Sequence, residues 1–337
     1  MSEIVLTQRE LNRALLARQL LLERSKLPIP RALERMGGIQ DQYAPNAYIR
    51  LWSYLEDFRR EQLTRALERR TVVQGTLMRT TIHLVSAQEY WLYAAGLRRA
   101  VREWQLRVDK ATPREMRRRA AKLRVALLSG PVSAKELDGR AQLWENVVRA
   151  PPSGTWERRR ADIYALAEQC VGPGTASEAD GHDHLIRSYL RGFGPAAVED
   201  ASSWAGVPVR LLAPALERLR LRRFRDERGR ELLDLPRAPL PAGDTPAPVR
   251  FLPWWDGVML VHARRTGILP EEYRPVVFDN KNPPSVPTFL VDGRVAGAWR
   301  YDDGRIELEP YEPLSRHALR ELRQESERLA AFMGEGG

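Results

Sequence analysis

Two glutamines, Gln40 and Gln42, are separated by one residue in segment 37–45, which reads Gly-Gly-Ile-Gln-Asp-Gln-Tyr-Ala-Pro. A neutral carboxamide both donates and accepts hydrogen bonds, so two of them can hold and orient a water molecule without removing its proton. Residues two apart in an extended segment project to one side, which favours a shared target for both carboxamides. The alternative is a polar turn whose glutamines satisfy nearby backbone groups.

The flanking residues predict how this segment is held. Residues 29–36 have a helical pattern with Pro30 in the first turn, and Gly37 and Gly38 are suited to the left-handed conformation that ends a helix. Pro45 disfavours helical geometry in the residue before it. The sequence therefore predicts a helix, a glycine stop and a short non-helical segment that carries both glutamines.

Helical and strand patterns recur in the order of a winged-helix module, which is helices followed by a two-stranded wing. The first module has helical patterns up to residue 69 and a β-branched, alternating stretch at 72–85. Gly-Pro pairs at 130–131 and 194–195 open two similar units, a weak internal repeat. In the later unit, helical patterns at 198–204 and 209–221 precede an alternating stretch at 222–235.

The last third of the chain has a different pattern. Residues 236–248 contain five prolines and predict an extended connector. The sequence then predicts strands at 249–252, 258–261, 288–291, 295–301 and 305–309, and a helix at 315–332. We therefore predict an α+β fold of tandem winged-helix modules (helix-turn-helix plus β-wing) with a C-terminal β-meander and closing helix, divided into residues 1–112, 113–192, 193–240 and 241–337.

Several segments together carry a family resemblance, namely 38–42, 51–55, 77–85, 194–206, 252–256 and 290–300. In these segments the sequence resembles the bacterial winged-helix DNA-binding superfamily that includes the AlkZ-type (azinomycin-resistance) DNA glycosylases. The resemblance covers nearly the whole chain and implies removal of N7-alkylated guanine, including unhooking of interstrand crosslinks. It makes Gln40 and Gln42 the catalytic residues of a Gln-x-Gln motif. Asp41 stands where the family pattern is apolar, and Asp41 and His83 are the predicted neighbours of the active site.

The implied reaction is monofunctional base excision. An N7-alkylated guanine already carries positive charge and leaves readily, so the two glutamines would mainly place a water near C1′ of the sugar. Asp41, if it faces the site, would add negative charge there. We expect no lyase step, because no lysine lies nearby to form a Schiff base, and no metal or organic cofactor. An open cleft between modules would suit bulky lesions better than a tight flipping pocket.

Two other classes of function compete with this one. A non-enzymatic DNA-binding protein, such as a transcription regulator using the helix-turn-helix at 198–221, would bind undamaged DNA selectively. A protein-interaction scaffold would show negligible, salt-insensitive affinity for DNA.

The composition fits a polyanionic partner. The 337 residues include 54 Lys and Arg against 44 Asp and Glu, a formal charge of +10, although the strong preference for Arg also has a source in genome base composition. The single cysteine, Cys170, fits a reducing cytosol. With no signal peptide and no apolar run near the roughly 18 residues of a membrane span, we expect a cytoplasmic protein, associated with the nucleoid when bound to damaged double-stranded DNA. No membrane and no obligate protein partner are predicted.

Basic clusters occur in all three predicted modules, and phosphate contacts from them would make DNA affinity fall with salt. Segment 279–284 combines Asn, Lys and Pro, which suit a probe entering the minor groove. Each cluster is otherwise a solvated helix face, and 279–284 an ordinary loop. The predicted DNA contacts are Arg118, Arg119, Arg158, Arg159, Arg222, Arg223, Asn280, Lys281 and Asn282.

Two further motifs have structural interpretations. His182 and His184 follow segment 172–181, which predicts a loop, and no other His or Cys lies at ligand spacing, so we expect a helix cap rather than a metal site. Asp256 follows two tryptophans and is expected to pack the meander while bonding to backbone. A buried, partly neutral carboxyl is the alternative for Asp256.

Overall fold

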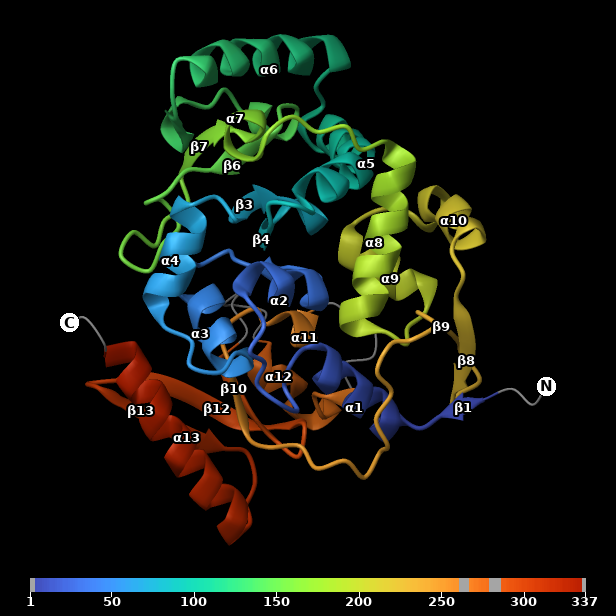
Figure 1. The fold of residues 1–337 in the computed structure, drawn as a ribbon, viewed down its shortest axis with the longest axis vertical. Helices are drawn as coiled ribbons and strands as arrows, with labels where there is room; N and C mark the ends of the chain where they lie inside the picture. The colour runs from blue at the N-terminus through green and yellow to red at the C-terminus, as the bar shows by residue number, and fades with distance from the viewer. Residues whose placement is uncertain (1–3, 261–266, 279–285, 335–337) are drawn as a thin grey trace.

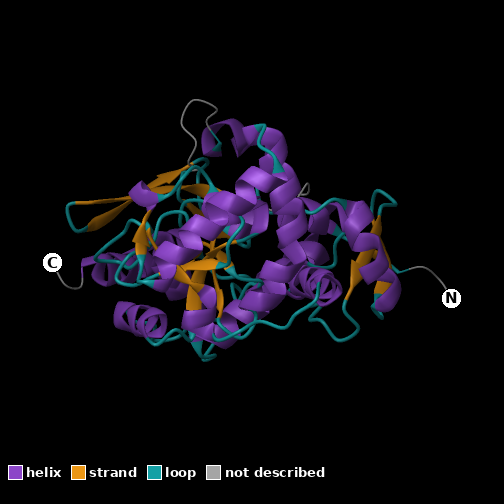
Figure 2. Ribbon diagram, turned by 90° about the horizontal axis from the view of Figure 1, so that it is seen from above, coloured by secondary structure: helices purple, strands orange, loops and turns teal. Residues whose placement is uncertain are grey.

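The computed structural model describes residues 4–260, 267–278 and 286–334. Its first strand and its last helix lie on opposite sides of the molecule, and the helices surround the central strands (Figures 1 and 2). The strands form three sheets, and the helices pack around these sheets. The α+β class predicted from the sequence is therefore confirmed.

A six-stranded antiparallel sheet connects the first two predicted modules. Its strand order is β2-β4-β3-β6-β7-β5, and β3 meets β6 where Gly75 lies opposite Val148. Strands from 1–112 and from 113–192 thus form one continuous sheet. The strands are β2 (Ile39–Gln40), β3 (Val72–Thr76), β4 (Ile82–Ser86), β5 (Val132–Ser133), β6 (Val147–Arg149) and β7 (Ile163–Leu166).

The helices of this part follow local sequence signals. Thr7 accepts a hydrogen bond from the backbone of Glu10, whose side chain accepts from the backbone of Thr7, so a capping box starts the first helix. The helices are α1 (Gln8–Arg18), α2 (Ile29–Met36), α3 (Pro45–Tyr54), α4 (Arg60–Glu68), α5 (Tyr90–Asp109), α6 (Pro113–Leu128), α7 (Ala167–Val171) and α8 (Glu178–Phe193). Figure 1 shows α6 at one end of the molecule, above β6 and β7.

The loop predicted at 172–181 is wrong from residue 178 onward, because α8 begins at Glu178. The reason is a second capping box, in which Ser177 accepts from the backbone of Asp180 and the Asp180 carboxylate accepts from the backbone of Ser177. His182 and His184 consequently lie inside the helix rather than at its cap.

Helices α5 and α8 cross closely at two glycines. A Cβ atom on Gly96 would lie 2.7 Å from the backbone carbonyl of Gly181, and one on Gly181 would overlap the backbone nitrogen of Gly96. This approach lets α8 pack directly on α5 while its other neighbours include α2 and α10.

The next unit contains α9 (Val198–Ala205), α10 (Val209–Arg218), β8 (Arg222–Asp226) and β9 (Glu231–Asp234), so the predicted helix, turn, helix and hairpin order is confirmed. A short strand that the sequence did not reveal, β1 (Val5–Leu6), pairs in parallel with β8. Arg18 of α1 forms a fully buried, two-bond ion pair with Asp234 at 2.7 and 2.9 Å, which ties the first helix to this unit.

The C-terminal sheet is an antiparallel meander in chain order, formed by β10 (Arg250–Leu252), β11 (Thr288–Val291), β12 (Arg294–Asp302) and β13 (Arg305–Pro310). Helix α13 (Arg316–Gly334) packs against β13 and closes the chain. The strand predicted at 258–261 is wrong over residues 258–260, which belong to α11 (Gly257–Leu260), and residue 261 lies outside the described residues. Its start is fixed by Asp256, whose Oδ1 accepts from the backbone of Val258 at 3.0 Å. The short α12 (Arg274–Val277) follows.

One large hydrophobic core runs through the first four helices, α8 and the meander. None of the helices in the described part of the chain combines the length and apolar character that a bilayer span requires.

Candidate active site

The predicted glycine stop places the Gln-x-Gln segment at the edge of the six-stranded sheet. Gly37 ends α2 in the left-handed conformation at φ 80°, and Gly38 follows at φ 77°. The chain then enters β2, which pairs with β4 so that Gln40 lies opposite His83. The predicted extended conformation is therefore confirmed for Gln40 but not for Gln42, which lies in a bend after the strand. Ala44 has helical angles, φ −49° and ψ −43°, although it precedes Pro45.

Gln40 is held by Arg79. The Nη2 of Arg79 donates to Oε1 of Gln40 at 2.6 Å, and its Nη1 donates to the backbone carbonyl of Trp204 at 2.5 Å. Burial lowers the pKa of Arg79 to about 10, so the guanidinium stays charged at neutral pH. One side chain thus connects the β3–β4 turn, the Gln-x-Gln strand and the end of α9.

The backbone at Arg79 is strained. Arg79 and Thr80 have φ values of 52° and 59°, a left-handed conformation that is uncommon for residues other than glycine. Gly206, the left-handed residue that ends α9, lies against Arg79, and a Cβ atom there would be 3.1 Å from the Cα of Arg79. Close packing at Gly206 therefore helps to hold the turn in place.

Gln42 is exposed and held by backbone, because its Oε1 accepts from the N–H of Ile82 at 3.2 Å. Both glutamine oxygens therefore face donors, which fixes the orientation of the two carboxamides. Among the described residues neither Nε2 group donates a hydrogen bond, so both amide donors can bind a water or a substrate.

Asp41 lies in the interior, with 1% of its surface exposed. Its carboxyl accepts a hydrogen bond from Nε2 of Gln74, which also donates to the backbone carbonyl of Gly154 at 2.8 Å. Burial raises the pKa of Asp41 to about 7, against the opposing effects of Gln74 and Arg149. The expected negative charge of Asp41 near the sugar required its side chain to face the site. The Asp41 side chain is buried in the interior and does not face the site.

His83 of β4 lies opposite Gln40 of β2, and its side chain is buried. Its Nδ1 lies 3.1 Å from the backbone carbonyl of Thr81. Burial and then the charge of Arg79 lower the pKa of His83 to about 3, so the ring is neutral at physiological pH. His83 is therefore not an imidazolium acid at physiological pH.

A buried charge cluster lies behind the segment. Asp256 pairs with Arg50 of α3 at 3.3 Å and accepts from the Tyr54 hydroxyl at 3.0 Å, in addition to the expected backbone bond from Val258. Arg50 also donates to Gln19 at 2.9 Å. Sequence reasoning missed Arg79 as the residue that positions Gln40, and it missed the buried pair of Arg50 with Asp256. Arg79 stands within the family-like segment 77–85, which was the available signal.

The predicted DNA contacts occupy varied positions. Arg118 is exposed on α6, Arg119 pairs with Glu115 at 2.7 Å and Arg158 with Asp162 at 3.5 Å, Arg222 lies 4.6 Å from the Phe224 ring centroid, and Arg223 pairs with Glu231 at 2.5 Å. Arg159 donates to the hydroxyl of Tyr43 at 2.9 Å and so lies beside the Gln-x-Gln segment. Asn280, Lys281 and Asn282 fall outside the described residues.

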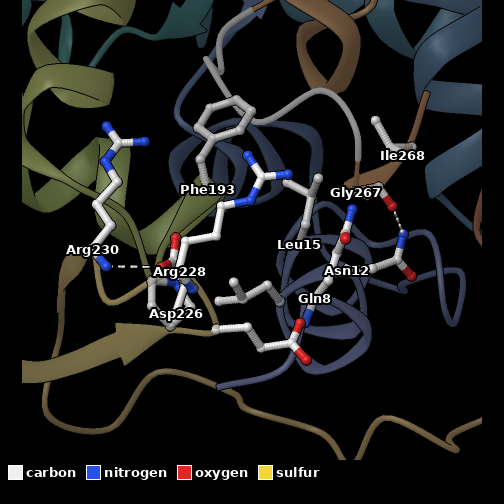
Figure 3. A pocket seen from close by; sticks show the side chains of 12 residues that line it. Gln8, Asn12, Leu15, Phe193, Asp226, Arg228, Arg230, Gly267 and Ile268 are labelled. Atoms are coloured by element: carbon white, nitrogen blue, oxygen red, sulfur yellow. Dashed lines mark hydrogen bonds between the residues drawn. The ribbon is translucent and has the colours of Figure 1, made fainter. Parts of the chain in front are cut away.

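A cavity of about 170 Å³ lies between α1 and the β8–β9 hairpin. Figure 3 shows Arg228 and Leu15 within it, and the hydrogen bond from Asn12 to the carbonyl of Gly267, which is 2.9 Å long. Its lining mixes acidic and basic side chains and contains no residue of 39–43. Within the described ranges, no three His, Cys, Asp or Glu side chains gather as a metal-binding group.

Comparisons with known proteins agree with this arrangement. The family model described as DNA glycosylase AlkZ-like matches residues 33–332. Among solved structures, the Streptomyces sahachiroi DNA glycosylase AlkZ superimposes with a TM-score of 0.85, covers 98% of each chain and is 19% identical in sequence. Comparison with curated protein sequences gave no significant match.

Proposed function

We propose, from the premise that this chain belongs to the AlkZ-like DNA glycosylase family, that it hydrolyses the glycosidic bond of N7-alkylated guanine, including bulky and interstrand-crosslink lesions. As a DNA glycosylase it is a hydrolase that acts on DNA. The observation that carries the proposal is the pair of carboxamides at Gln40 and Gln42, each with its oxygen held by a donor and its amide group free among the described residues.

The proposed reaction begins with departure of the cationic base. The C1′–N9 bond breaks, its electron pair goes to the alkylated purine, and an oxocarbenium ion forms at the sugar. One carboxamide donates to the water through its free amide group, and the second lone pair of the other carboxamide oxygen accepts from the water, which leaves a water lone pair directed at C1′. The water adds to C1′ and releases a proton to solvent, leaving an abasic site and the free base.

The environment of the glutamines supports this route over base catalysis. Asp41 is buried against Gln74 and His83 is buried and neutral, while the charged neighbour of Gln40 is the cation Arg79. A strong general base is unnecessary, because the oxocarbenium ion is electrophilic enough to react with a well-placed neutral water.

The substrate in this proposal is damaged double-stranded DNA, bound by tandem winged-helix modules. The helix, turn, helix and hairpin order of α9, α10, β8 and β9 supports the module at 193–240. The modules at 1–112 and 113–192 would share the six-stranded sheet, and 241–337 would add the meander.

The test uses duplex DNA containing N7-methylguanine, and in parallel a nitrogen-mustard crosslink, with wild type, Gln40→Ala and Gln42→Ala. Free base and abasic sites are both followed. The exposed Gln88→Ala serves as a matched glutamine control. Release that is lost in both motif variants and kept in Gln88→Ala supports the proposal. Absence of release by wild type from both lesions, despite binding to the duplex, rejects these substrates.

A further inference from the structure

An aromatic pair, made of an exposed Trp254 and a half-buried Tyr43, lies directly beside the Gln-x-Gln segment. Trp254 keeps 38% of its surface exposed, and its ring lies 5.7 Å from that of Tyr43, the residue after Gln42. The two rings are tilted by 59°. Trp254 therefore offers an exposed ring surface next to Tyr43, the residue that follows Gln42.

The chain holds this pair from behind. Trp254 belongs to the turn between β10 and α11, in which Trp255 adopts a left-handed conformation at φ 53°. The next residue, Asp256, is buried and paired with Arg50 of α3. Helix α3 begins at Pro45, two residues after Tyr43, so one helix fixes both sides of the pair.

A cation borders the same surface. Arg159, from the loop between β6 and β7, donates to the Tyr43 hydroxyl at 2.9 Å, and its guanidinium carbon is 6.0 Å from the Tyr43 ring centroid. The side chain is exposed. An exposed guanidinium beside Tyr43, whose ring in turn contacts Trp254, matches the alternation of phosphate and base along a DNA strand.

We infer that Trp254 and Tyr43 form the stacking surface for the alkylated purine at the glutamines, with Arg159 contacting an adjacent phosphate. Aromatic rings stack on the faces of bases, and the electron-rich face of tryptophan attracts cations. An N7-alkylated guanine offers both a flat ring and a positive charge, so this surface favours it over a neutral purine. The inference rests on the proposed function and names the contact that selects the lesion.

The test separates stacking from packing at one position. Trp254→Phe keeps an aromatic face, whereas Trp254→Leu keeps apolar volume without one. Release of N7-methylguanine is measured in single turnovers with enzyme in excess, which gives the maximal rate and the enzyme concentration at half-maximal rate. The compared quantity is the maximal rate divided by the enzyme concentration at half-maximal rate. We expect this ratio to stay within about threefold of wild type in Trp254→Phe and to fall about tenfold or more in Trp254→Leu.

Arg159→Gln gives a second readout. Loss of one phosphate contact should weaken binding and lower the slope of log affinity against log salt by about 1. Equal activity of Trp254→Phe, Trp254→Leu and wild type would overturn the stacking surface. Equal losses in both Trp254 variants, together with a lower melting temperature, would also overturn it in favour of packing.

Binding to a duplex with 2′-fluoro-N7-methylguanine distinguishes this inference from the proposed function, because the fluorine slows glycosidic cleavage. A preference for this duplex over undamaged DNA that depends on the Trp254 ring supports the stacking surface even if wild type releases no base. Release by wild type with no such dependence on Trp254, in binding or rate, rejects the stacking surface and leaves the proposed function intact.

Discussion

Replacing Arg79 with methionine removes both donors that the guanidinium supplies to Gln40 and to the carbonyl of Trp204. A freed glutamine side chain regains up to about 2 kcal/mol of rotamer entropy, which must be lost again when the water is positioned. If that cost falls on the transition state, the maximal rate drops by about 30-fold. The two acceptors also lose their charge-assisted hydrogen bonds, so the free energy of unfolding should fall by about 2 kcal/mol.

The assay is single-turnover release of N7-methylguanine with saturating enzyme, together with urea unfolding and binding to undamaged duplex. Arg118→Met is the matched control, because it also removes one positive charge but from an exposed position on α6. The control should change DNA affinity at most and leave the maximal rate intact. Arg79→Lys should recover only part of the rate, since one ammonium cannot reproduce the two-acceptor fork.

The reasoning fails if folded Arg79→Met reaches a maximal rate within twofold of wild type. It also fails if the whole defect disappears at saturating enzyme, because Arg79 would then contact DNA rather than position Gln40. A defect shared with Arg118→Met would point to net charge as the cause.

Three further predictions concern the surrounding structure. Burial raises the pKa of Asp41 to about 7, so the free energy of unfolding should fall as pH rises from about 4 to about 7. Asp41→Asn should remove that decline and be more stable than wild type by about 4 kcal/mol at pH 8 but not at pH 4, as measured by urea unfolding. Gly206→Ala should lower stability by about 1–2 kcal/mol, because φ is 72° and the new Cβ atom crowds Arg79, and it should slow base release; an unchanged melting temperature and rate would contradict this. Arg18→Met should cost about 3–5 kcal/mol in urea unfolding by leaving Asp234 buried without its partner, and a loss below about 1 kcal/mol would show that the pair contributes little.

Local signals in the sequence predicted the elements that carry the glutamines. Gly37 and Gly38 act within a few residues, and the end of α2 and the start of β2 follow them. The family resemblance, drawn from segments spread along the chain, agrees with the family model over 33–332.

What the sequence did not reveal depends on contacts between distant segments. Buried Asp41 is bonded to Gln74 of β3, and Gln74 is bonded to Gly154 in a loop more than a hundred residues from Asp41, which no local pattern records. The contact of Arg79 with Trp204 likewise needs the end of α9 beside the β3–β4 turn. The apolar stretch at 258–261 fits a strand by composition, but the cap at Asp256 makes it helical.

The crossing of α5 and α8 at Gly96 and Gly181 has a consequence for how this sequence can diverge. Glycine to alanine changes inside helices commonly raise stability through helix propensity, by up to about 1 kcal/mol. At these two sites alanine cannot raise stability in this way, because a methyl group on either helix would overlap the backbone of the other. Neither change can be compensated by its partner, which is already the smallest residue. Descendants that keep this crossing should therefore retain both glycines, and mutant libraries for thermostability should leave both codons fixed.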